Sequence, residues 1–93
     1  MRTILGAFWA QKLALPAGTA TPLVGSGDGR PTDARKSLVL KNATGNVLYI
    51  GGSNVDAANG YPLDSGEVFP ADSVGGLYGF SVAGGNVSLL EGF

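Results

Sequence analysis

RKSLVLKNATGNVLYIGGSNVDAANGYPL, residues 35–63, is the stretch that decides the fold. It holds two apolar runs, Leu38–Leu40 and Val47–Ile50, separated by the turn-forming segment 42–46 (NATGN). Valine, isoleucine and tyrosine favour strands, while asparagine and glycine tolerate the positive φ that a tight turn needs. The stretch therefore predicts a β-hairpin over residues 37–50, which we expect to nucleate the fold.

A long polar loop follows the hairpin, from Gly51 to Leu63. The Gly51-Gly52 pair allows backbone geometry that other residues resist, and Asn59-Gly60 is a strong turn signal. Tyr61 and Leu63 are expected to anchor the loop on the core. A loop of this length is either structural cover or a contact surface.

The rest of the chain repeats short strands and turns. Apart from the hairpin, strands are expected within residues 1–15, at 68–69 before Pro70, and at 77–83 and 87–90. Gly84-Gly85-Asn86 predicts a second hairpin between the last two. No segment makes a good helix, so the prediction is an all-β fold: a small β-sandwich or barrel of about six short antiparallel strands.

The chain is short enough for one domain, spanning residues 1–93. Residues 1–34 are expected to form an N-terminal strand or arm and a loop rich in glycine and proline, and residues 35–93 the β-sandwich core. Within the first part, Gly25-Ser26-Gly27-Asp28-Gly29 predicts a flexible loop. It lacks the lysine of a phosphate-binding loop and the alternating acids of a calcium loop.

Charge is scarce: 14% of residues are charged, and the net charge is −1. An average globular domain has about 25%. With 44% hydrophobic residues, this predicts a surface partly covered by self-association or by a larger assembly, the alternative being a monomer with an ordinary apolar surface. The charge balance gives no basic field for nucleic acid, and no apolar run is long enough for a membrane helix.

Catalytic chemistry finds little support. The sequence has neither cysteine nor histidine, which removes thiolate nucleophiles, the commonest general base and the commonest metal ligands. The seven acids fall in expected turns, loops and the C-terminal end, where carboxylates are usually solvated. We therefore expect no enzyme activity, no catalytic residues, no cofactor and no metal. Tyr49, Tyr61 and Tyr78 are candidates for sugar contact, although strand tyrosines are more often half-buried.

Four segments carry a family resemblance: RKSLVLKN, NVLYIGGSNV, NGYPLDSGE and the closing LYGFSVAGGNVSLLE. Over roughly residues 35–91, the chain resembles small accessory virion proteins of tailed bacteriophages and prophages. The connection at residues 25–34 departs from that pattern, because the corresponding connection in these proteins is shorter. The resemblance implies a β-sandwich virion component.

With the low charge, the resemblance predicts a capsid decoration (cement) protein, made in the host cytoplasm and located on the outside of a phage head. Its partner would be the major capsid protein, whose neighbouring subunits it would bridge. The expected contact residues are Phe8, Trp9, Gly51, Gly52, Asn54, Asn59, Gly60, Tyr61 and Leu63. The alternatives are a tail or head-fibre module that binds a host-surface carbohydrate or protein, and a head–tail joining component.

Overall fold

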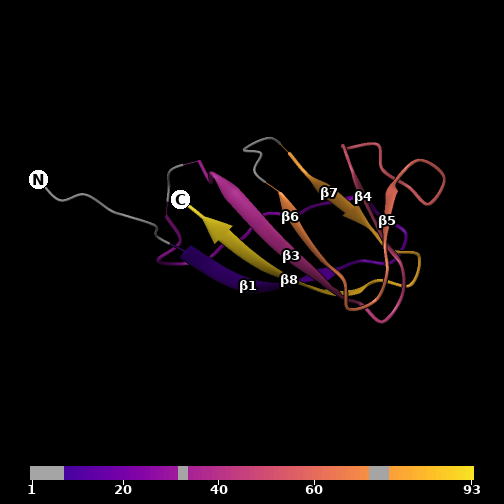
Figure 1. Ribbon diagram of the computed structural model, residues 1–93, viewed down its shortest axis with the longest axis horizontal. Coiled ribbons are helices and arrows are strands. Elements are labelled where there is room, and N and C mark those ends of the chain that lie inside the picture. The colour runs from indigo at the N-terminus through magenta and orange to yellow at the C-terminus, as the bar shows by residue number, and fades with distance from the viewer. Residues whose placement is uncertain (1–7, 32–33, 72–75) are drawn as a thin grey trace, which may run out of the picture.

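A computed structural model describes residues 8–31, 34–71 and 76–93 (Figure 1). These segments contain eight β-strands: β1 (Phe8–Leu15), β2 (Thr21–Pro22), β3 (Ser37–Ala43), β4 (Leu48–Gly51), β5 (Tyr61–Leu63), β6 (Val68–Ala71), β7 (Tyr78–Phe80) and β8 (Gly85–Gly92). They make two four-stranded sheets with orders β1-β8-β3-β6 and β2-β7-β4-β5. All recorded strand pairs are antiparallel. The prediction of a small all-β sandwich is confirmed.

The sandwich closes over leucine-rich inner faces. β3 alternates strictly, with Leu38 and Leu40 buried and Val39 exposed between them. β8 places Val87 and Leu89 on the same inner face, as its period-two pattern predicts. A fully buried leucine contributes about 1.5–3 kcal/mol relative to exposure, so this layer is the main source of stability. The other members of the core are Leu15, Leu23, Leu48, Ile50 and Leu63.

Both predicted hairpins are wrong. β3 and β4 belong to different sheets, as do β7 and β8, so each glycine turn carries the chain across the sandwich. Gly45 and Gly84 do adopt positive φ, at 81° and 75°. A turn signal specifies a local reversal, whereas the strand's final partner depends on distant segments.

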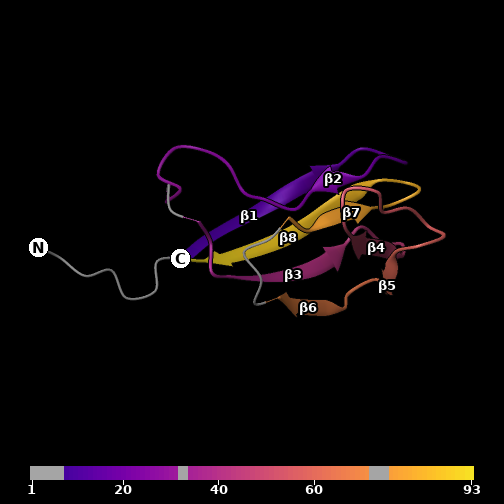
Figure 2. The same ribbon diagram turned by 90° about the horizontal axis from the view of Figure 1, so that it is seen from above.

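The N-terminal strand pairs within its own chain. All eight residues of β1 oppose β8, from Phe8↔Gly92 to Leu15↔Gly85. Trp9 and Leu13 turn their side chains toward the inner face and are half-buried, and Leu15 is buried. Residues 1–7 of the predicted strand lie outside the described residues. β8 is therefore a central strand between β1 and β3 (Figure 2).

β6 passes through Pro70 to Ala71, where the sequence predicted that the strand would stop before the proline. β6 lies at the edge of its sheet. An edge strand tolerates proline because its missing N–H need not face a neighbour.

Candidate functional site

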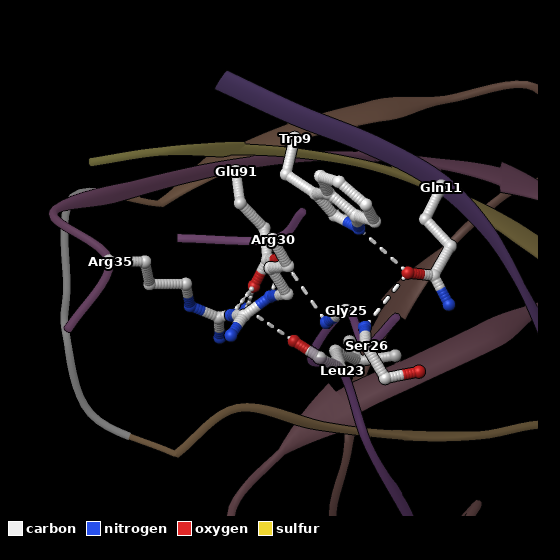
Figure 3. Close-up of polar contacts among 8 residues, drawn as sticks. All are labelled: Trp9, Gln11, Leu23, Gly25, Ser26, Arg30, Arg35 and Glu91. Carbon is white, nitrogen blue, oxygen red and sulfur yellow. Dashed lines mark hydrogen bonds and ion pairs between the residues drawn. The ribbon is translucent and has the colours of Figure 1, made fainter. Parts of the chain in front are cut away.

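One carboxylate lies inside the sandwich, where no acid was expected. Glu91 is fully buried in β8, on the same inner face as Leu89. Arg30 meets it with two parallel bonds, Nε to Oε1 at 2.9 Å and Nη2 to Oε2 at 2.8 Å (Figure 3). Arg35 donates from Nη1 to Oε2 at 2.9 Å, and the Gly25 backbone N–H donates to Oε1 at 3.1 Å. Both carboxylate oxygens are thus fully engaged, and we call these four residues the Glu91 cluster.

The two arginines come from segments distant in sequence from β8. Arg30 belongs to the connection after β2, and its guanidinium lies 5.1 Å from the centre of the Phe93 ring. Arg35 lies just before β3, is itself buried, and also donates to the Leu23 carbonyl. A planar guanidinium can satisfy a carboxylate and a second acceptor together, which suits it to such a buried position. The cluster ties the long connection to the end of the central strand.

The pKa of Glu91 is lowered by its surroundings. Burial alone would raise it, but the hydrogen bonds from Arg30, Arg35 and Gly25, with the Arg30 charge, outweigh burial. The pKa of Arg30 is raised, chiefly by its bond to Glu91, against the opposing effect of desolvation. The carboxylate therefore stays ionised and has no free lone pair directed at a substrate, so its role is structural.

The glycine-rich segment 25–29 covers Trp9 with defined contacts, although the sequence predicted a flexible loop. Gln11 Oε1 accepts the Trp9 indole N–H at 2.9 Å and the Ser26 backbone N–H at 2.8 Å (Figure 3). A side chain at Gly25 would place its Cβ 2.8 Å from Trp9 Cδ1 and would also overlap Glu91. Glycine at this position therefore lets the backbone approach closely enough to reach the carboxylate.

Sequence reasoning missed the Glu91 cluster, although one signal was present. Val87, Leu89 and Glu91 alternate along one strand, which places the acid on the buried face. A buried acid requires a cation. The sequence contains candidate arginines but does not say which of them reach the strand.

The outer face of the sheet β1-β8-β3-β6 carries an exposed apolar row. Ala10 lies opposite Leu90, Leu90 opposite Val39, and Val39 opposite Pro70, so the row crosses all four strands. Directly opposed residues project on the same face of a sheet. Leu90 and Val39 are 41% and 37% exposed. We call these four residues the outer apolar row.

Basic and apolar side chains flank the outer apolar row. Phe8 and Val68 are 65% and 55% exposed on the same face. Lys12 and Lys41 both lie opposite Ser88 and are exposed. The outward positions of these four described strands hold no carboxylate. The face is weakly basic and largely apolar.

The loop after β4 has a firm internal structure. Val55 is buried and serves as its anchor together with Leu63. Asp56 Oδ1 accepts from the backbone N–H of Ala58 and Asn59, and the Asn59 side chain donates to the Asn54 carbonyl. Tyr61 is 61% exposed, so the prediction that it anchors the loop is wrong. Its ring lies 5.9 Å from that of Phe69, across the side of the sandwich between β5 and β6.

One expected contact residue is wrong, because Leu63 is buried in the core, while Tyr61 is exposed. The other expected contact residues form two separate groups. Phe8 and Trp9 begin β1, at the end of the molecule near the label C, whereas the loop of Gly51, Gly52, Asn54, Asn59 and Gly60 lies at the opposite end (Figures 1 and 2). Phe8 projects outward, while Trp9 turns inward beneath the 25–29 segment. The fold thus does not bring the two groups together.

The described residues hold no group of three or more acidic, histidine or cysteine side chains suited to a metal ion. No helix within them could cross a membrane. Neither a family model, nor a curated protein, nor a solved structure matches the chain.

Proposed function

We propose that the chain is a structural virion protein, a decoration (cement) protein that binds the outside of a phage head and stabilises contacts between major capsid subunits. The observation that carries this proposal is the outer apolar row with its flanking Phe8 and Val68. An exposed apolar surface of this kind is typical of a contact surface. The choice of the major capsid protein as partner follows from the sequence hypothesis that residues 35–91 resemble phage accessory proteins.

The distribution of charge supports a contact role. The carboxylate of Glu91 is paired with both Arg30 and Arg35 inside the fold, so it is not offered to a substrate. On the outer face, Lys12 and Lys41 remain at the border of the apolar row. Such a pattern, with an apolar centre and charge at the rim, suits a protein surface as partner, and the lysines favour a capsid patch with carboxylates at matching positions.

Decoration works by repetition. Each copy contributes a modest apolar contact, and many copies on one shell together resist expansion and dissociation. The two groups of expected contact residues lie at opposite ends of the molecule. That separation suits a bridge between neighbouring capsid subunits, with the outer face of the sheet lying on the shell.

The direct experiment compares particles with and without the protein. Particles that lack it should lose resistance to heat and dilution, and added purified protein should restore that resistance by binding in many copies over the shell. Shells of unchanged stability, or binding confined to a few copies at the tail, would contradict the proposal.

A matched pair of variants tests whether the outer face of the sheet β1-β8-β3-β6 binds the capsid. Leu90→Glu puts a charge at the centre of the outer apolar row, whereas Val82→Glu puts the same charge on a residue that is 67% exposed outside it. We expect L90E to weaken capsid binding at least about tenfold, because an unpaired charge buried in an interface costs well over ~1.4 kcal/mol. V82E should bind normally, and equal binding by both variants would remove this face from the interface.

One observation favours the second candidate, a tail or head-fibre module that binds host-surface carbohydrate. Tyr61 is 61% exposed and lies at a tilted angle of 48° to Phe69. Exposed aromatic rings are suited to stacking on sugars. Binding of the purified protein to isolated host polysaccharide, lost in Tyr61→Ala but retained in L90E, would establish this function in place of decoration.

A further inference from the structure

Two lysines share one row on the outer face of the sheet β1-β8-β3-β6. Lys12 on β1 and Lys41 on β3 both lie opposite Ser88 on β8, and both lysines are exposed. Neighbouring strands lie about 4.8 Å apart, so the two lysine backbones are roughly 10 Å apart with the serine midway between them. Directly opposed residues project on the same face of a sheet. We call these three residues the Lys12–Ser88–Lys41 row.

Within the described residues, no carboxylate neutralises either lysine of this row. The two ion pairs recorded there both belong to the Glu91 cluster, inside the sandwich. The outward positions of the four strands hold no acid. Glu67 directly precedes β6, but its side chain accepts the backbone N–H of Asp64 at 2.7 Å. The two ammonium groups are therefore available to an anion that a partner supplies.

The Lys12–Ser88–Lys41 row lies directly beside the outer apolar row. Leu90 and Ser88 are two residues apart on β8, so their positions on the outer face are only about 7 Å apart. A partner surface that covers Leu90 must therefore also approach the lysines and displace water from them. Burying a charge without a counter-ion is unfavourable, so a surface that binds here needs an anionic group above this row. On a protein surface that group is a carboxylate.

We propose that the capsid partner places a single carboxylate over Ser88, where Lys12 and Lys41 hold it from opposite sides. This inference rests on the decoration role proposed above and names the chemistry of the capsid surface that the outer face recognises. A lysine carries its ammonium group on a flexible four-carbon stem, which reaches toward the midpoint between the two strands. A carboxylate has two oxygens, one for each ammonium group, and the Ser88 hydroxyl beneath it can donate a third bond.

The coupling between the two lysines tests whether they share one acid. Affinity for shells that lack the protein is measured for Lys12→Gln, Lys41→Gln and the double variant. With a shared carboxylate, either lysine alone still neutralises it, so we expect each single variant to lose only about threefold in affinity. The double variant leaves the acid buried without a cation and should lose about thirtyfold or more. Two separate acids would instead give the product of the single losses, about ninefold.

Lys36→Gln is the matched control, because Lys36 is exposed just before β3 and its variant removes the same charge outside the row. It should bind normally, and urea unfolding checks that every variant is folded. If the wild-type protein binds and L90E does not, a double variant that binds normally or loses only the product of the single losses overturns the shared carboxylate and leaves decoration intact. A loss in K36Q equal to that in K12Q would also overturn it. Failure of the wild-type protein to bind the shells would instead refute the decoration role, and this inference with it.

Discussion

Two buried polar side chains hold this sandwich, and they do so in opposite ways. Glu91 lies at one end of the inner face of β8, and Asn42 at the other end of the inner face of β3, opposite Val87. Leu40 and Leu89, which oppose each other, lie between them. Both polar side chains are fully buried and fully bonded. Glu91 is charged and bonds to residues 56 to 66 positions away in the sequence. Asn42 is neutral and bonds to residues 2 to 21 positions away.

Asn42 organises the crossover between β3 and β4. Its Nδ2 donates to the carbonyls of Asn46 and Leu63, at 2.7 and 2.8 Å. Its Oδ1 accepts from the Thr44 backbone N–H at 3.0 Å and from the Thr44 hydroxyl at 2.7 Å. A single amide thus satisfies four partners where the chain leaves one sheet for the other. The comparison teaches that the crossover from β3 to β4 needs only an amide, whereas the connection after β2 is tied to β8 by the ion pair between Arg30 and Glu91.

The largest expected effect on stability comes from removing the charge of Glu91. Glu91→Gln leaves Arg30 and Arg35 without their anion, one of them deeply buried. Removing one partner of a buried pair costs about 3–5 kcal/mol, and partial exposure of Arg30 favours the lower end. The free energy of unfolding in urea measures this loss. Asp28→Asn removes the same charge from an exposed position in the 25–29 segment, and an equal loss there would refute the assignment.

Removing the hydrogen bonds of Asn42 should lower the free energy of unfolding by less. Asn42→Leu keeps a similar volume but leaves the carbonyls of Asn46 and Leu63 and the N–H of Thr44 without this partner. We expect a loss of about 2 kcal/mol, because a buried unsatisfied group typically costs about 1–3 kcal/mol. The control is Asn86→Leu, on an exposed position of the same sheet, which should change stability by less than about 0.5 kcal/mol. Similar losses in both variants would mean that the buried bonds are not what stabilises the crossover.

Acid should lower the stability that Glu91 provides but not the stability that Asn42 provides. This is the smallest of the three expected effects, because protonated Glu91 can still share hydrogen bonds. The pKa of Glu91 in the folded protein lies below its ordinary value of 4.5. Its ionisation therefore stabilises the fold fully above 4.5, and this contribution is lost as the pH falls through the lowered value. The difference in free energy of unfolding between the wild-type protein and E91Q should become smaller in acid. The difference between the wild-type protein and N42L should stay constant. Denaturation series at neutral and acidic pH measure both gaps, and a constant E91Q gap would contradict the pKa direction.

The sequence predicted the class of fold because that depends on local pattern. The alternation in residues 37–42 and 87–90 correctly places Leu38, Leu40, Val87 and Leu89 inside. It did not predict the pairing of strands, since Gly45 and Gly84 produce the same turn in a hairpin and in a crossover. Asn42 was interpreted as a turn residue, whereas it is a strand residue whose side chain builds the turn.

The candidate site was harder to predict for a related reason. A short-range motif can be recognised from neighbouring residues. The role of Glu91 depends instead on its ion pairs with Arg30 and Arg35, which the spacing of these residues in the sequence does not predict. The outer apolar row likewise depends on the register of four strands. Phe8 was identified from its type alone, and its exposure agrees with a contact role.

The central place of β8 also constrains how the chain can fold in time. β1 ends at Leu15, yet its partner β8 begins only at Gly85. On a ribosome, β1 emerges early and stays without its neighbour until nearly all of the described chain has been made. Contacts between such distant segments close slowly, because the entropy of the intervening loop is lost before the pairing is gained. Strands that are neighbours in the sheet are thus made far apart in time. The segment FWAQKLAL is therefore the part of the chain that most needs protection from aggregation before folding is complete.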